Sequence, residues 1–218
     1  MTVASQTELE VIREFRTQLL SDLTQYISSA TIQAAAKRLK LWQQGRVCLD
    51  EDDSTAGLTF LQYCIFDFTR NGTTALDRYI AQNQPQGGSC EARFLEALCD
   101  SAFTIHKVVK HISEDEVELE DLSNGDANLV KEKGFWTKSR PGMLIATRLV
   151  NMGDLVLTSG VFFGLSSSDP DDASPPRIPA VHTRDQALAR TEALLQSLLR
   201  PSQLSEFGSA SAANHDLM

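Results

Sequence analysis

The chain has 218 residues, of which 42% are hydrophobic and 22% are charged, and it carries a formal net charge of -9. This composition is ordinary for a globular protein and argues against a disordered chain, and the length suffices for one domain or two small ones. The sequence contains no secretory signal and no apolar run of about 18 residues, so we expect a cytoplasmic protein with no membrane association. The acidic charge disfavours binding of nucleic acid through the overall field.

Residues 1–101 are predicted to form a helical region. Ser5 and Glu8 have the spacing of a capping box, and apolar residues then recur at every third or fourth position, as in an amphipathic helix. A second helix is expected from about residue 31 to residue 44, because Gly45 can adopt the left-handed conformation that ends a helix. The first helix must bury its apolar face against other elements.

The acidic run at residues 50–54 is interpreted as a solvated loop, because it lacks the alternating ligand spacing of a calcium loop closed by a glutamate at position 12. The segment that follows, residues 58–68, is apolar nearly all round and predicts a buried helix. Thr74 and Ser89 are favourable N-terminal caps, so a helix is expected after each of them.

The hydrophobic period changes after residue 102, where short β-rich segments separated by turn residues predict strands. Five such segments follow one another: FTIHKVVKHI, EVELEDL, ANLVKEK, MLIATRLV and DLVLTSGVFFG. Their spacing favours a five-stranded antiparallel sheet or partly open barrel over residues 102–165. A module of this size buries little surface by itself, so we expect it to pack on the helices.

The C-terminal part is predicted to contain one helix. Residues 166–182 have the composition of a linker, residues 183–200 carry regularly spaced leucines, and residues 201–218 are expected to be a disordered tail. The predicted fold class is therefore α+β, with an N-terminal helical region packed with the small sheet or barrel, plus a C-terminal helix.

The four cysteines do not have the spacing of a metal site. They are separated by 16, 26 and 9 residues, so no C-x-x-C pair occurs, and we interpret them as reduced thiols, mostly in the core. No metal and no cofactor is expected. The cysteines are Cys48, Cys64, Cys90 and Cys99.

Two histidines on the first predicted strand are the best candidates for acid–base chemistry. His106 and His111 are five residues apart, which places them on opposite faces of a strand, so they cannot easily share one metal ion. An enzyme would need folding to bring Asp67 next to one of them in a concave pocket. The sequence therefore predicts no catalytic residue, but it leaves an unrecognised enzyme open.

A cationic stretch interleaved with aromatic residues follows the third predicted strand. Single-strand binders on small barrels combine cations that follow the phosphate backbone with aromatic rings that stack on bases. Nearby acidic residues, among them Glu118, Glu120 and Glu132, would oppose a phosphate backbone. A solvated sheet edge, protein recognition and nucleic-acid binding are the alternatives. The candidate interaction residues are Lys131, Lys133, Trp136, Lys138 and Arg140.

Four segments between residues 58 and 165 resemble a family of uncharacterised bacterial proteins, some of which carry a SEC-C motif. They are FLQYCIFDFTRNGTTALDRYIA, ARFLEALCDSAFTIHKVV, VELEDLSNGDANLVKEKG and SRPGMLIATRLVNMGDLVLTSG. The resemblance implies structural roles for its matching residues. The cysteines and histidine of the SEC-C motif are missing, so a zinc-dependent role does not transfer. The matching residues are Phe66, Asp67, Phe68, Arg70, Leu119, Asp121, Leu122, Gly125, Arg140, Pro141 and Gly142.

We therefore expect an intracellular, non-enzymatic interaction or adaptor module whose partner is a protein. Single-stranded nucleic-acid binding through the β module is the alternative, although the net charge disfavours it. An unrecognised enzyme is the third possibility. The sequence does not indicate the oligomeric state.

Overall fold

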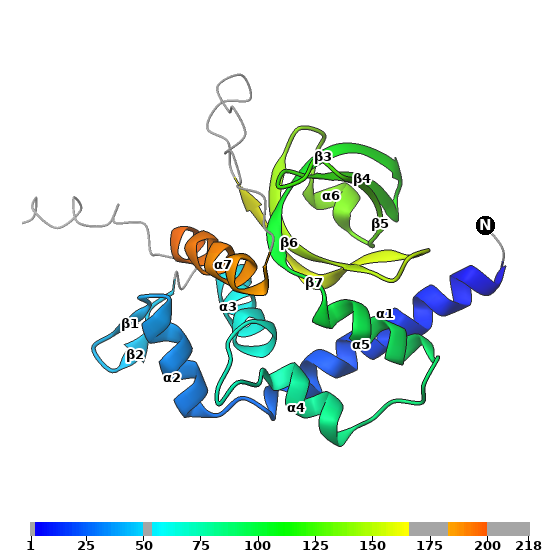
Figure 1. Cartoon of the computed structure of the whole chain (residues 1–218). Coiled ribbons are helices and arrows are strands. Elements are labelled where there is room, and N and C mark those ends of the chain that lie inside the picture. The colour runs from blue at the N-terminus through cyan, green and yellow to red at the C-terminus, as the bar shows by residue number, and fades with distance from the viewer. Residues whose placement is uncertain (1–2, 50–53, 166–182, 200–218) are drawn as a thin grey trace, which may run out of the picture.

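The computed structural model describes residues 3–49, 54–165 and 183–199 (Figure 1). The expected linker at residues 166–182 and the expected tail at residues 201–218 lie outside this range. The elements before the barrel are α1 (Val3–Thr24), α2 (Ser29–Arg38), β1 (Trp42–Gln43), β2 (Arg46–Val47), α3 (Ser54–Phe66), α4 (Ala75–Gln82) and α5 (Cys90–Cys99).

Helix α2 ends earlier than the sequence predicts. Lys40, with a φ of 59°, takes the left-handed position that was expected for Gly45, and the amides of Lys40 and Leu41 close the helix on the carbonyls of Lys37 and Ala36. This pairing is a Schellman motif, and it lets the chain turn while Leu41 stays fully buried. Gly45 instead lies in the tight turn of the β1–β2 hairpin.

The other helix starts agree with the sequence to different degrees. Helices α4 and α5 begin directly after their predicted caps, Thr74 and Ser89, whose side chains accept hydrogen bonds from the backbone amides of Asp77 and Ala92. Helix α1 begins at Val3, before the expected cap at Ser5, because neither proline nor glycine precedes that position. Helix α3 begins at Ser54 and ends at Phe66, so it is displaced towards the N-terminus of the expected range.

Each of the five predicted strands forms. The strands belong to one closed barrel in the order β3-β4-β5-β7-β6. A short helix, α6 (Phe135–Lys138), lies between the third and fourth strands of the barrel. The strands are β3 (Phe103–Ser113), β4 (Glu116–Asp121), β5 (Ala127–Lys131), β6 (Leu144–Asn151) and β7 (Val156–Leu165).

The expected antiparallel sheet or partly open barrel is corrected in two respects. The barrel is closed, and its β5–β7 pair is parallel, joined at Val130 and Val156. The reason is the connection through α6, which carries the chain across one end of the barrel so that β6 pairs with β3 and β7 arrives beside β5 in the same direction. This strand order, with a helix between the third and fourth strands, is that of the OB-fold.

The barrel interior is a hydrophobic core closed at one end by α6. Gly134, with a φ of 81°, allows the sharp turn into this helix, and Phe135 is 1% exposed and lies 4.5 Å from the ring of Phe162. Because interior and exterior side chains alternate along each strand, this core also identifies the outward-facing residues. The fully buried interior side chains are Val108, Val117, Leu119, Val130, Phe135 and Ile145.

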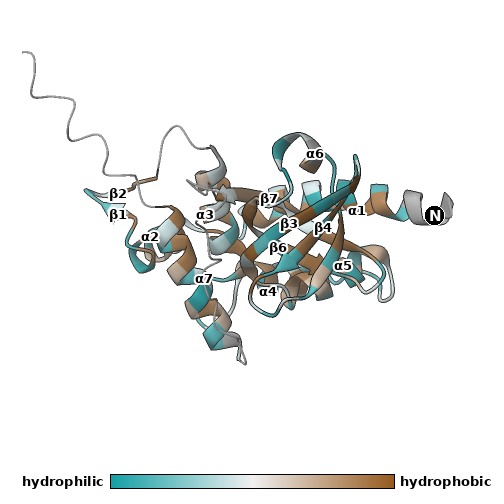
Figure 2. Ribbon diagram, turned by 90° about the horizontal axis from the view of Figure 1, so that it is seen from above, coloured by the Kyte–Doolittle hydropathy of each residue, from teal (hydrophilic) through white to brown (hydrophobic). Residues whose placement is uncertain are grey.

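Helices cover the barrel on its outer side, as expected for a module too small to stand alone (Figure 1). Apolar side chains of α1 and α5 pack with Val150 and Leu157 in one cluster. Helices α2, α3 and α7 (Arg184–Leu198) pack with Phe103 and Ile105 in a second cluster. Helix α2 and the β1–β2 hairpin lie at the end of the molecule away from the barrel (Figures 1 and 2). None of the described helices combines the length and apolar composition needed to cross a membrane.

Candidate functional site

OB-folds usually hold their ligands on the face of their second and third strands, which are β4 and β5 here, and the outward side of β3 continues this surface. It is bordered at one end by the β3–β4 turn, residues 114–115. We call this surface the barrel face, and its residues are Lys107, Val109, Lys110, Ile112, Glu116, Glu118, Glu120, Ala127, Leu129 and Lys131.

Charges on the barrel face are paired across the strands. Lys110 lies 3.1 Å from Glu118, and Lys131 lies 3.6 Å from Glu116. Lys107 stands opposite Glu120 in the β3–β4 register. The three cations are thus balanced by three carboxylates in a row along β4, and the face has no excess positive charge with which to hold phosphates.

Between these charges the barrel face exposes aliphatic side chains. Val109 is 37% exposed, Ile112 is 49% exposed and Leu129 is 46% exposed. The register places Leu129 opposite Glu118. Strands β3, β4 and β5 contain no aromatic residue except Phe103, which is buried, so this face offers no ring on which a base could stack.

The candidate cationic residues do not form a single surface. Lys131 belongs to the barrel face, but its side chain is only 13% exposed. Lys138, at the end of α6, and Arg140 are exposed, whereas the side chain of Trp136 lies outside the described part of the chain. Lys133 is also exposed and lies beside Lys131 at the end of the barrel next to α1.

Glu132 has a different role from the one that the sequence indicates. It is 7% exposed, and its carboxylate accepts two hydrogen bonds from the guanidinium of Arg16, at 2.6 and 3.0 Å. The hydroxyl of Thr158 donates a third, at 2.7 Å. Glu132 therefore joins α1 to the barrel near the β5–β7 junction and is not available to repel a ligand.

A hollow of about 330 Å³ lies between α1 and the end of the barrel face. Arg13 of α1 lines it, and the Nε and Nη2 atoms of this side chain are shielded from solvent and have no hydrogen-bond partner among the described residues. No sequence motif pointed to Arg13. We call this cavity the α1 hollow, and it is lined by Leu9, Glu10, Arg13, Ser113, Asp115, Glu116, Lys131 and Lys133.

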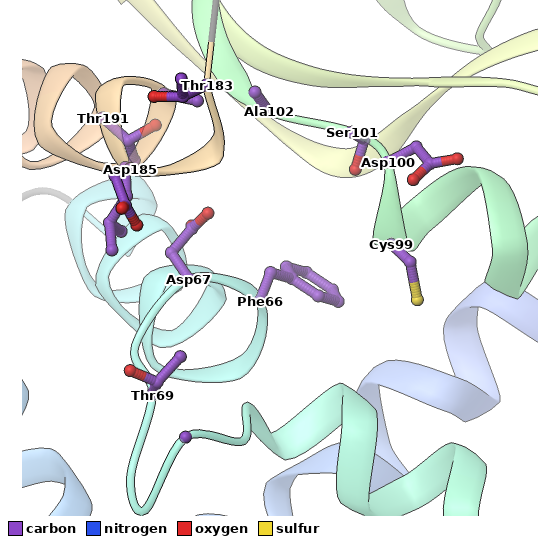
Figure 3. Close-up of a pocket in the computed structure, with 13 residues that line it drawn as sticks. Phe66, Asp67, Thr69, Cys99, Asp100, Ser101, Ala102, Thr183, Asp185 and Thr191 are labelled. Carbon is purple, nitrogen blue, oxygen red and sulfur yellow. The ribbon is translucent and has the colours of Figure 1, made fainter.

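A second hollow, of about 680 Å³, lies where the ends of α3 and α5 meet the start of α7. Phe66 and Asp67 at the end of α3 face the segment that joins α5 to β3 (Figure 3). Asp67, Asp100 and Asp185 make its lining acidic, but Asp67 is already paired with Arg148 at 2.6 Å.

Arg148 explains the Phe-Asp pattern at residues 66 and 67. Its residue exposure is 1%, it donates to the carboxylate of Asp67 and to the carbonyl and hydroxyl oxygens of Ser101, and it lies over the ring of Phe66 at 5.1 Å. The pair therefore ties α3, the α5–β3 connection and β6 together. The structural role expected for Asp67 has a physical basis in these contacts.

Folding does not bring Asp67 next to either histidine. His106 is 1% exposed and lies opposite Asp121 on the interior side of the barrel, whereas Asp67 contacts Arg148 on the outside. Burial lowers the pKa of His106, while the Asp121 carboxylate and the backbone of Thr147 oppose this shift. His106 is therefore a neutral interior side chain near pH 7.

Cysteines and metal-binding residues form no recognisable centre. In the parts of the chain that the structure describes, no group of three or more His, Cys, Asp or Glu side chains could hold a metal ion. None of the four cysteines, all of which lie in the described residues, forms a disulfide, and only Cys64 is fully buried, so the expectation that most lie in the core is wrong. Burial and the Asp67 carboxylate raise the pKa of the Cys64 thiol to about 12.

The chain belongs to a family of unknown function, DUF7986, whose model matches residues 4–172. The match includes α1, α3 and all five barrel strands, and it confirms the expected relation to an uncharacterised family. No curated protein and no solved structure matches the chain.

Proposed function

We propose that this member of DUF7986 is a non-enzymatic interaction module that binds a segment of another protein on its barrel face. The chemistry of that face carries the proposal. Ile112, Leu129 and Val109 are exposed aliphatic side chains among paired charges, and protein interfaces commonly combine an apolar centre with a polar rim. The OB-fold topology by itself supports only the place of binding, because one fold serves many functions.

The partner segment should be apolar with at least one basic side chain. The carboxylates of Glu116, Glu118 and Glu120 form a row along β4, and the whole chain carries a net charge of -9. A basic side chain on the partner would complement the net negative charge of the chain, and aliphatic side chains would cover Ile112 and Leu129. We keep the expectation that the protein is bacterial and cytoplasmic and that its relatives include SEC-C proteins, which interact with other macromolecules.

A capture experiment with matched variants tests this proposal. Three proteins are immobilised: the parent, the double variant Ile112→Ser with Leu129→Ser, and the control Leu58→Ser. Each is incubated with a native lysate, and the proteins that it retains are identified by mass spectrometry. Leu58 is a suitable control because it is 51% exposed but lies on α3. We expect one set of proteins to be retained by the parent and the control and to be lost with the double variant. Equal retention by all three would contradict the proposal.

Single-stranded nucleic-acid binding is the second candidate, favoured by the OB-fold topology and by the exposed cations Lys133, Lys138 and Arg140. The row of glutamates on β4 weighs against it. At 150 mM salt we expect the parent to bind mixed-sequence DNA and RNA with a dissociation constant above about 10 μM. The reason is that a small number of cations displaces only a small number of counterions from the phosphates. Submicromolar binding in fluorescence anisotropy that Lys138→Glu abolishes would make nucleic acid the better assignment.

An enzymatic function has less support from the site. The structure separates Asp67, which pairs with Arg148, from His106 inside the barrel and from His111 beside Ser139, so neither of the two acid–base pairs that the sequence left open forms. The hollow at the ends of α3 and α5 contains carboxylates, but its Asp67 is held by Arg148. We therefore assign no catalytic residue.

A further inference from the structure

Helix α7 lies outside the part of the chain that matches the family, which ends at residue 172, whereas the surface beneath the helix lies inside that part. Apolar side chains of α2, α3 and the start of β3 form this surface, and we call it the α7 surface. Leu195 and the cap residue Leu199 are each 1% exposed against it, and Leu188 is partly buried two turns before Leu195. Such spacing is typical of an amphipathic helix that binds in the apolar groove of another protein.

Glu192 fixes the orientation of α7 on this surface. Its carboxylate accepts a hydrogen bond from the Tyr63 hydroxyl at 2.9 Å and pairs with the Arg38 guanidinium at 2.6 Å. The Glu192 side chain is 14% exposed, so these two donors replace much of its contact with water. One residue earlier, the hydroxyl of Thr191 donates to the carbonyl of Phe103 at 3.3 Å. The α7 surface therefore selects a helix that carries a carboxylate between its aliphatic side chains.

The first half of α7 is held less closely than the second. Asp185, Leu188 and Thr191 line the hollow of about 680 Å³ that lies between this half and the ends of α3 and α5 (Figure 3). Asp185 shares the hollow with Asp100, and two carboxylates oppose a closer approach. The Nη1 atom of Arg190 is shielded and has no hydrogen-bond partner among the described residues, so release of α7 would return this donor to water. These features favour local opening of α7 while the rest of the chain stays folded.

The same hollow shows how another helix would bind more tightly than α7. Helix α7 presents only the small side chain of Ala187 to it, next to Leu188, while Asp67 and the exposed Asp100 also line it. A basic side chain in place of Ala187 would fill part of the hollow and complement these carboxylates. A helix in the same chain acts at a high effective concentration, so α7 can occupy the surface without the tightest possible sequence.

We propose that α7 is an autoinhibitory segment that reversibly covers a helix-binding surface, and that a partner protein displaces it with an amphipathic helix of the same pattern. The pattern has leucines at positions equivalent to Leu188, Leu195 and Leu199 and a glutamate equivalent to Glu192. In the partner helix a basic residue replaces Ala187. This inference goes beyond the proposed function, because the α7 surface ends on β3 before the barrel face begins at Lys107 and has no residue in common with that face.

Hydrogen exchange of the full parent chain tests whether α7 opens by itself. The backbone amides of residues 188–195 are compared with those of residues 63–65 in the buried part of α3. We expect the α7 amides to exchange at similar rates to one another and at least tenfold faster than the α3 amides. Equal protection of both helices would show that α7 opens only with the whole molecule and would overturn the proposal.

A fluorescent peptide of residues 183–199 then tests the surface. Its binding to the full parent chain is compared with its binding to full-length Leu195→Asp, in which the chain's own α7 docks less well. We expect at least tenfold tighter binding to the variant, because the surface of the parent is already covered. Equal binding to both, or none to a variant that circular dichroism shows to be folded, would overturn the proposal. If Leu195→Asp does not fold, the milder Glu192→Gln takes its place.

Variants of this peptide test the pattern and the chemistry of the partner helix. We expect the Glu192→Gln peptide to bind at least fivefold more weakly, because Tyr63 and Arg38 lose the carboxylate. The Ala187→Arg peptide should bind at least threefold more tightly than the parent peptide. Ala193→Arg is the matched control at an exposed position and should leave the affinity unchanged. An unchanged affinity of Glu192→Gln, or equal affinities of the two arginine peptides, would contradict the proposed partner helix.

Two further measurements separate this inference from its alternatives. Adding Ile112→Ser and Leu129→Ser to the Leu195→Asp chain should not change its affinity for the peptide. A loss of affinity would place the peptide on the barrel face, which would overturn this inference and leave the proposed function standing. Sedimentation of the parent should show a monomer. A dimer that Leu195→Asp abolishes would name α7 of a second copy as the occupant and overturn the assignment to a partner protein.

Discussion

The ion pair between Asp67 and Arg148 should be among the most costly contacts to remove. The Arg148 side chain is 2% exposed and that of Asp67 is 12% exposed, and their closest atoms lie 2.6 Å apart. Removing one partner of a buried pair leaves the other charge uncompensated, which costs about 3–5 kcal/mol. We expect Asp67→Asn to lower the free energy of unfolding by about 3 kcal/mol, because the amide oxygen can still accept a hydrogen bond.

Arg148→Met should cost more, about 4 kcal/mol, because it also removes the donor to the carbonyl of Ser101. In the double variant the two losses overlap, since neither charge remains to be stranded. We therefore expect it to resemble the worse single variant and to show a coupling of about 2–3 kcal/mol. Such losses are a large part of a typical stability of about 5–15 kcal/mol.

Urea unfolding followed by circular dichroism measures these differences. Lys110→Ala is the control, because the Lys110–Glu118 pair is exposed on the barrel face and such pairs contribute about 0–1 kcal/mol. Single variants at Asp67 and Arg148 that are no less stable than this control would refute the reasoning. Additive effects in the double variant would show that the two residues act separately.

Two further predictions concern the barrel interior and the last helix. Because burial lowers the pKa of His106 from its ordinary value of 6.5, the unfolded chain takes up a proton that the folded chain does not, so stability should fall as the pH drops below about 6.5. In urea titrations at pH 7.5 and 5.5, His106→Leu should show a smaller loss of unfolding free energy between the two pH values than the parent. An equal loss in both proteins would contradict the assignment of His106 as a neutral interior side chain. Leu195 on α7 is 1% exposed, so Leu195→Asp should cost about 2 kcal/mol or more. The control Ala189→Asp, at an exposed position of the same helix, should leave the stability nearly unchanged. Equal melting temperatures for Leu195→Asp and Ala189→Asp would argue against docking of α7.

Local signals were sufficient to predict the strands of the barrel and several helix caps. The five β-rich segments correspond to β3, β4, β5, β6 and β7, because alternation of side chains and turn residues act between neighbours in the chain. The caps at Thr74 and Ser89 form as predicted for the same reason. The helix end expected at Gly45 was wrong, since the burial of Leu39 and Leu41 made Lys40 adopt the left-handed conformation.

For the candidate site, sequence reasoning found part of the residues but not their arrangement. Lys131 and Lys133 do line one cavity, whereas Lys138 and Arg140 lie elsewhere, on the segment around α6. The row of glutamates on β4 was visible in the sequence, but its pairing with lysines of β3 and β5 depends on the strand register. Arg13 carried no signal, because its place in the lining of the α1 hollow depends on how α1 packs against the barrel.

The sequence by itself thus determined the α+β fold class and the location of the β module. Only the tertiary structure decided that the barrel closes, that β5 and β7 run parallel, that Asp67 pairs with Arg148, and that Arg13 and Lys133 line the same cavity. The physical reason is the range of the interactions. Side-chain alternation and capping act over a few residues, whereas strand order, buried ion pairs and cavities depend on contacts between segments far apart in the chain.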